Sequence, residues 1–103
     1  MPKNYPRADR VEKLALEVIG EAVQQLKDPR LGFVTVTGVK LSGDLRMARV
    51  FVSALGTREE RDDSIAAVKH AAGHLRSVFG KEVRMRHLPQ LEILEDQLSL
   101  IHI

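Results

Sequence analysis

The apolar residues of this sequence change their spacing along the chain, and that change constrains the fold more than any other feature. Across residues 11–26 they recur at intervals of three and four, which predicts an amphipathic helix with one buried stripe. The stripe consists of Val11, Leu14, Ala15, Val18, Ile19, Ala22, Val23 and Leu26. Two starts are open for this helix, near Asn4 or at Asp9. Its end is expected at Asp28, because Pro29 disfavours helical geometry in the residue before it.

The following segment is rich in β-branched residues and predicts two strands. The first is expected at residues 33–42, where Gly38 indicates a bulge. The second is expected at residues 47–55. The residues that alternate onto one of its faces are Ala48, Val50, Val52 and Ala54. Turn-forming residues at 42–44 lie between the strands, so we expect an antiparallel hairpin.

A second helical period begins after Thr57, which forms the pattern of a capping box with Glu60. Its apolar stripe consists of Ile65, Val68, Ala72, Leu75 and Phe79. Gly73 interrupts this stripe at a cost of about 1 kcal/mol relative to alanine, which predicts a kink or a close backbone contact. Gly80 is expected to end the helix.

The last element is a strand over residues 83–87 and 91–94 that Pro89 interrupts. The resulting order is α-β-β-α-kink-α-β. It predicts a two-layer α+β domain in which a three-stranded sheet carries its helices on one face.

The composition narrows the function classes. A chain of 103 residues suits one domain, and the absence of cysteine excludes disulfide frameworks, thiolate metal sites and cysteine nucleophiles. No apolar run approaches the roughly 20 residues that span a bilayer, and the first residues lack a signal-peptide stretch. We therefore expect a cytoplasmic protein with no membrane partner.

Positive charge is concentrated in one part of the chain. The net charge is only +2, but residues 69–88 carry Lys69, Arg76, Lys81, Arg84 and Arg86 against Glu82 alone. Acidic segments flank this stretch on both sides. Such segregation suits a surface that meets phosphate, and a solvated basic face is the alternative interpretation.

Catalytic patterns are weak by comparison. His70 and His74 have the spacing of two metal ligands on a helix, but a His-Glu-x-x-His pattern and a third ligand are missing, so a metal-dependent hydrolase is a minor hypothesis. The carboxylates at residues 59–63 lie where they would complement a helix dipole. No nucleophile elbow and no phosphate-binding glycine loop occurs. We expect no enzyme activity, no metal and no cofactor.

Arg84 and Arg86 alternate with Val83 and Met85 in the predicted strand, which would direct both guanidinium groups to one side. Arginine suits phosphate because its planar fork donates two parallel hydrogen bonds. Aromatic residues are few, which disfavours a reader that stacks successive bases. Recognition of the backbone and shape of structured RNA is the favoured interpretation.

The sequence resembles the ribosome-binding factor A family, which assists assembly of the bacterial small ribosomal subunit. The blocks that carry the resemblance are Arg10-Val11, Lys27 to Gly32, Val34 to Thr37 with Val39, Ser42-x-Asp44-Leu45, Ala48-x-Val50, Ala71-Ala72-Gly73 with Leu75-Arg76, Gly80, the basic residues up to Arg86, and Pro89-x-Leu91. They cover about residues 7–96.

The resemblance implies a KH-like domain of type II order over residues 1–96. It also implies that a helix–kink–helix at Ala71 and Gly73 replaces the usual Gly-x-x-Gly loop. The implied function is non-catalytic binding to the small (30S) subunit and its 16S rRNA, with a role in late rRNA maturation and growth in the cold.

By position, the resemblance makes Arg10, Arg30, Lys69, Arg76, Lys81, Arg84 and Arg86 the candidates for RNA contact. Arg30 has an alternative role in the turn after Pro29, and Arg10 could instead pair with Asp9 or Glu12. Residues 97–103 depart from the family pattern and are interpreted as an atypical or truncated tail. The alternative function is a protein-interaction module that pairs through a sheet edge or this apolar tail, whereas the leading interpretation expects a monomer when free.

Overall fold

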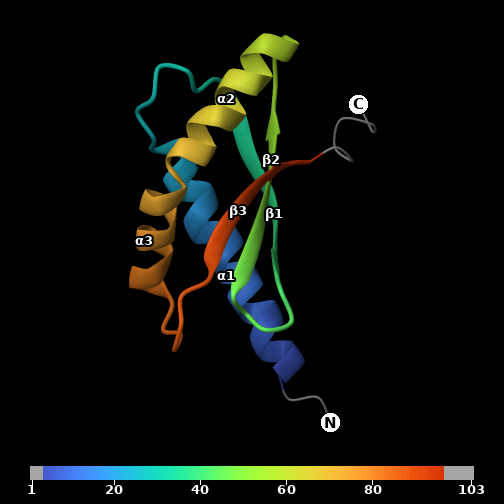
Figure 1. Cartoon of the computed structure of the whole chain (residues 1–103), viewed down its shortest axis with the longest axis vertical. Helices are drawn as coiled ribbons and strands as arrows, with labels where there is room; N and C mark the ends of the chain where they lie inside the picture. Colours follow the sequence, from blue (N-terminus) through green and yellow to red (C-terminus); the bar gives the residue numbers. More distant parts are fainter. Residues whose placement is uncertain (1–3, 97–103) are drawn as a thin grey trace.

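The computed structural model describes residues 4–96, with side chains from residue 8 onwards. Three helices and three strands follow one another in the order α-β-β-α-α-β, which confirms the predicted type II KH-like arrangement (Figure 1). The elements are α1 (Asn4–Gln24), β1 (Val34–Leu41), β2 (Met47–Ala54), α2 (Arg58–His70), α3 (Ala72–Glu82) and β3 (Gln90–Glu95).

The sheet has the order β1-β2-β3, so β2 is central and the other two strands form the edges. β1 pairs with β2 in an antiparallel register, whereas β3 pairs with β2 in parallel after the chain has passed through α2 and α3. The register shifts between Val36 and Gly38, which confirms the predicted bulge.

The core lies between one face of the sheet and the helices. Alternate residues of the strands point into it, including all four residues that the spacing placed on one face of β2. From α1, Ile19 and Val23 are buried, and α3 contributes Leu75 and Phe79. Figure 1 shows the helices gathered on one side of the sheet, as predicted.

The first helix ends earlier than Pro29 suggested. α1 stops at Gln24, and the N–H groups of Gln25 and Leu26 donate to carbonyls three residues back, which tightens the last turn. The Gln24 side chain then donates to the Val34 carbonyl at 2.6 Å. The chain therefore leaves the helix in time to enter β1, and Pro29 lies in the connecting loop.

The second helical segment is broken at Ala71, at the predicted kink. Thr57 and Glu60 form the expected capping box at the start of α2. Ala71 lies between α2 and α3, and Gly73 is already part of α3, where a Cβ would meet no atom within 4 Å. The break is therefore confirmed, whereas no close contact inside the described fold requires glycine at position 73.

Gly80 does not end the helix, which continues to Glu82. A Cβ at Gly80 would lie 2.7 Å from Leu88 Cδ2, so this glycine leaves room for the loop that follows α3.

The predicted strand at residues 83–87 is also wrong. β3 begins only at Gln90, whose N–H donates to the Arg46 carbonyl. The preceding residues form a loop, because the side chain of Arg76 binds the carbonyls of Leu88 and Pro89 in place of a neighbouring strand.

Within residues 4–96, no helix is both long and apolar enough to cross a membrane. The tail at residues 97–103 lies outside the described residues.

Candidate nucleic-acid interface

The loop that joins α3 to β3 is fixed by contacts on both of its sides. The Arg76 guanidinium donates to the Pro89 carbonyl from Nε at 2.9 Å and to the Leu88 carbonyl from Nη2 at 2.8 Å. Pro89 is fully buried, and Val83 caps α3 through its N–H to the Phe79 carbonyl. The loop over residues 83–89 therefore has a defined shape.

Arg84 and Arg86 project from this loop and are exposed, while Met85 between them packs against the core. Neither arginine forms an ion pair within the described part of the chain. Arg84 and Arg86 therefore point to solvent and Met85 points to the core, as the alternation predicted, although these residues form a loop and not a strand.

A groove with a volume of about 720 Å³ lies beside the two arginines. Its walls come from the first part of α1, the turn between β1 and β2, and the loop after α3. Figure 1 shows that these three segments share one end of the molecule. The groove also includes Lys40, which the sequence does not distinguish from the other outward-facing polar residues of β1.

The turn between β1 and β2 is held by its own polar groups. Asp44 Oδ1 accepts hydrogen bonds from Ser42 Oγ at 2.7 Å and from the Arg46 N–H at 3.1 Å, and these bonds lower the pKa of the Asp44 carboxyl. Ser42 Oγ also accepts from the Met47 N–H at 3.0 Å. Leu45 has a φ of 62°, in the left-handed region.

The loop between α1 and β1, which carries Arg30, lies at the opposite end of the molecule (Figure 1). The Arg30 guanidinium forms a two-pronged ion pair with Asp28, with Nη2 at 2.9 Å from Oδ2 and Nε at 3.2 Å from Oδ1. The Arg30 side chain and backbone N–H hold the pKa of Asp28 at about 2. Arg30 therefore has the alternative role that the sequence allowed, because it stabilises the turn around Pro29.

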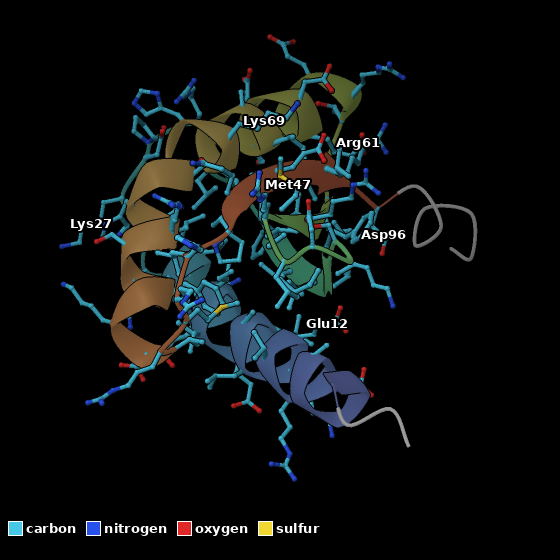
Figure 2. All side chains as sticks on the ribbon, turned by 60° about the horizontal axis from the view of Figure 1, so that its bottom comes forward. Glu12, Lys27, Met47, Arg61, Lys69 and Asp96 are labelled. Atoms are coloured by element: carbon cyan, nitrogen blue, oxygen red, sulfur yellow. The ribbon has the colours of Figure 1, made fainter. Side chains whose placement is uncertain are left out.

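The remaining candidates do not join the groove. Lys69 is exposed near the end of α2, and Figure 2 shows it well separated from Glu12, which lines the groove. Lys81 is exposed in the last turn of α3. Arg10 is exposed on α1, and no ion pair joins it to Asp9 or Glu12 in the described residues. The seven candidates are therefore spread over the molecule, and only Arg84 and Arg86 line the groove together.

Two further groups of residues, the histidine pair and the carboxylates at the start of α2, were considered as catalytic or metal sites. His70 and His74 lie in different helices, and residues 4–96 contain no group of three or more His, Cys, Asp or Glu side chains that could hold a metal ion. Glu60 serves the cap of α2, and the hydrogen bonds from Thr57 lower the pKa of its carboxyl.

The outer edge of β1 is engaged by α1. Gln24 donates to the Val34 carbonyl at one end of the strand, and Glu12 Oε2 accepts from the Leu41 N–H at 2.8 Å at the other. Strand addition along this edge would have to displace both contacts.

Comparisons with known proteins agree with this architecture. The family model of ribosome-binding factor A matches residues 7–99. A ribosome-binding factor A from Natranaerobius thermophilus is 45% identical over 92 residues, which cover 88% of this chain and 70% of the relative. One from Brevibacillus brevis is 45% identical over 95 residues, covering 91% and 78% of the two chains.

Solved structures show the same similarity. A putative ribosome binding factor A from Thermotoga maritima has 40% identity and a TM-score of 0.80, covering 91% of this chain and 90% of the other. The crystal structure of ribosome-binding factor A from Thermus thermophilus has 33% identity and a TM-score of 0.76, covering 85% and 93%. A homology model of the Thermus thermophilus factor, fitted into a cryo-EM map of a 30S-RbfA complex, has 34% identity and a TM-score of 0.71, covering 86% and 94%. The chain belongs to the ribosome-binding factor A family.

Proposed function

We propose that this protein binds the small ribosomal subunit through rRNA and assists late maturation of 16S rRNA, without catalysing a reaction. Membership of the ribosome-binding factor A family supports ribosome binding. The fitting of the Thermus thermophilus relative into a map of a 30S complex supports the small subunit as the partner.

The observation that carries the proposal is the state of Arg84 and Arg86. Both are exposed and unpaired among the described residues, on a loop that Arg76 and Pro89 hold in place. A loop whose backbone needs no rearrangement before its arginines meet phosphate loses less conformational entropy on binding. Uncompensated arginines on a fixed loop are the arrangement expected of a phosphate-binding surface.

The seven candidates then divide by what their side chains do in the fold. Arg84 and Arg86 contact phosphate directly, with Lys40 beside them and Lys81 and Arg10 extending the basic surface. Arg76 acts by positioning the loop, and Arg30 by ordering its own turn with Asp28. Lys69 belongs to a second contact region at the helix break.

Gly73 gives that second region its physical basis. It is exposed beside the break at Ala71, and a Cβ there would meet no atom of the described fold. A glycine that the fold itself does not need suits a position where an RNA backbone approaches the start of α3 closely.

Co-sedimentation with purified 30S subunits tests the proposal. The double variant Arg84→Glu/Arg86→Glu should lose at least about tenfold in affinity, because two charge-assisted contacts become repulsive. The matched control is Arg58→Glu/Arg61→Glu, which makes the same change of charge at the start of α2 and should retain most of the affinity. Equal losses in both variants would show a non-specific charge effect and contradict the assignment.

Salt dependence gives a second readout. Six phosphate contacts predict a slope of roughly −4 to −5 in a plot of log affinity against log salt, and removal of two contacts should make the slope shallower by about 1.5. The protein-interaction alternative predicts instead concentration-dependent dimers and no effect of the Arg84 and Arg86 changes. Analytical ultracentrifugation of the free protein distinguishes the two, since we expect a monomer.

A further inference from the structure

The groove beside Arg84 and Arg86 contains an apolar side chain that the fold does not require there. Leu45 lies at the tip of the β1–β2 turn, lines the groove and is 40% exposed. Its φ of 62° is a conformation that glycine and asparagine adopt readily and a leucine does not. A strained residue that packs into no core suggests a role outside the fold.

The turn around Leu45 keeps it in this conformation. The Leu45 N–H donates to the Ser42 carbonyl at 2.9 Å, and the Arg46 N–H donates to Asp44 Oδ1 at 3.1 Å. Ser42 Oγ links the two sides of the turn by donating to Asp44 and accepting from the Met47 N–H. The backbone on both sides of Leu45 is thus fixed by hydrogen bonds, and the turn holds the leucine side chain in an exposed position.

The groove has two kinds of lining. The apolar part of the lining consists of Leu45 and three less exposed side chains, Val11, Leu41 and Met85. Lys40, Arg84 and Arg86 supply positive charge on the same groove. A ligand that complements both the apolar and the positively charged lining must combine a flat or apolar group with an attached anionic group.

The carboxylates at the groove refine that description. Glu12 accepts a hydrogen bond from the Leu41 N–H, which orients its carboxylate toward the edge of β1 but does not remove its charge. Asp9 also lines the groove and can accept a hydrogen bond from an amino group, which adenine, guanine and cytosine carry and a bare phosphate does not. Bases inside a duplex are stacked and cannot enter such a groove without leaving the helix.

We propose that this groove binds an unpaired nucleotide, whose base or ribose packs on Leu45 and Met85 while its phosphates contact Arg84, Arg86 and Lys40. The groove lies away from the helix break at Ala71, so it is a site separate from the one assigned to Gly73. The inference rests on the proposed function, because the unpaired nucleotide belongs to the rRNA of the small subunit.

The test uses Leu45→Asn, which removes the apolar side chain but suits the left-handed backbone. The matched control is Leu55→Asn, an exposed leucine at the opposite end of the sheet. The probe is a single-stranded RNA hexamer of mixed sequence, titrated into the ¹⁵N-labelled full chain, with a duplex of the same sequence as the second arm.

We expect the hexamer to shift the amide signals of Leu45, Arg84 and Met85, and the duplex to shift them far less. Leu45→Asn should bind the hexamer at least fivefold more weakly, with a urea midpoint equal to or above that of the wild type, while Leu55→Asn binds as the wild type does. No binding of the hexamer, shifts confined to other regions, equal binding of the duplex, or wild-type affinity in Leu45→Asn would each overturn the inference.

Co-sedimentation of the same proteins with 30S subunits keeps the two proposals apart. Wild-type binding to 30S subunits without any hexamer response at the groove contradicts only the nucleotide site. Failure of the wild type to bind 30S subunits at low salt contradicts the proposed function, whatever the hexamer does. Cross-linking of the groove to a ribosomal protein and not to rRNA would identify the occupant as an apolar protein segment and overturn the nucleotide assignment.

Discussion

The loop from α1 to β1 and the loop from α3 to β3 both lead from a helix into an edge strand, and both carry exposed arginines. In the first loop Arg30 folds back onto Asp28, so its charge is compensated inside the fold. In the second loop Arg84 and Arg86 remain unpaired among the described residues, and a different arginine, Arg76, holds the loop. Exposure alone therefore does not distinguish a binding arginine from a structural one.

Each loop is also attached to the domain by one polar side chain. Ser64 of α2 is buried and accepts from the Gly32 N–H at 2.9 Å, which fixes the first loop. Arg76 of α3 does the same for the second loop through Leu88 and Pro89. The two attachments stabilise the fold, and in the proposed function only the second also positions groups for a partner.

Of the changes that test the difference between the two loops, Arg76→Ala should have the largest effect on stability and binding. It removes two hydrogen bonds from a charged donor and leaves two carbonyls without that donor, so we expect the free energy of unfolding to fall by about 2 to 3 kcal/mol in urea titrations. Affinity for 30S subunits should fall as well, because the loop loses its shape. The control Arg84→Ala should change stability by less than about 0.5 kcal/mol while weakening binding. Loss of binding without loss of stability in Arg76→Ala would mean that Arg76 contacts RNA itself.

Ser64→Ala is the corresponding change for the other loop. The Gly32 N–H loses its acceptor in a partly buried place, and we expect a loss of about 1 to 2 kcal/mol. Binding to 30S subunits should persist, because this loop carries no free arginine. Ser77→Ala, an exposed change on α3, should cost no stability. A strong loss of 30S binding in folded Ser64→Ala would place the first loop in the interface.

Gly73→Ala extends the comparison to the connection between α2 and α3. Because a Cβ at this position has open space, the change should raise the free energy of unfolding, by up to about 1 kcal/mol, through higher helix propensity. The same variant should bind 30S subunits more weakly if RNA approaches the start of α3. A stabilised variant with wild-type affinity would remove Gly73 from the proposed interface.

The smallest expected effect is the pH dependence of the stability that Asp28 contributes in the loop between α1 and β1. Asp28 has a pKa of about 2 in the fold, against an ordinary value of 3.8, because Arg30 donates to its carboxylate. Its stabilising contribution is therefore complete above the ordinary pKa and is lost as the pH falls through about 2. Asp28→Asn should have a lower urea midpoint than the wild type at pH 7, and the difference should shrink below about pH 4 and be largely lost near pH 2.

Arg30→Ala provides the control, since it removes the donors and should reproduce the behaviour of Asp28→Asn. A difference between wild type and Asp28→Asn that stays constant from pH 7 to pH 2 would contradict this assignment.

Local signals predicted much of this architecture correctly. The capping box at Thr57, the bulge at Gly38 and the break at Ala71 each depend on residues close together in the sequence. The errors concern features that distant residues decide. Gly80 reads as a helix end, but its partner Leu88 lies beyond the end of the helix and could not be paired with it in advance.

The site shows the same division. The basic segment was visible in the sequence, but the separation of Arg76 from Arg84 and Arg86 depends on where the loop carbonyls of Leu88 and Pro89 come to lie. Lys40 and Leu45 join the groove only because the β1–β2 turn folds next to the loop after α3. No spacing rule links positions so far apart.

The position of β2 between two differently oriented neighbours has a kinetic consequence. Val50 pairs with Val39 across a short turn, but with Ile93 only after two helices have been placed. Short loops close faster than long ones, so the hairpin should form early and β3 should join last. The loop that carries Arg84 and Arg86 ends at β3, and it cannot take its final shape before that strand is docked. An intermediate with a formed hairpin and an undocked β3 would therefore be compact yet unable to bind, and the appearance of binding activity during refolding should coincide with the slowest folding phase.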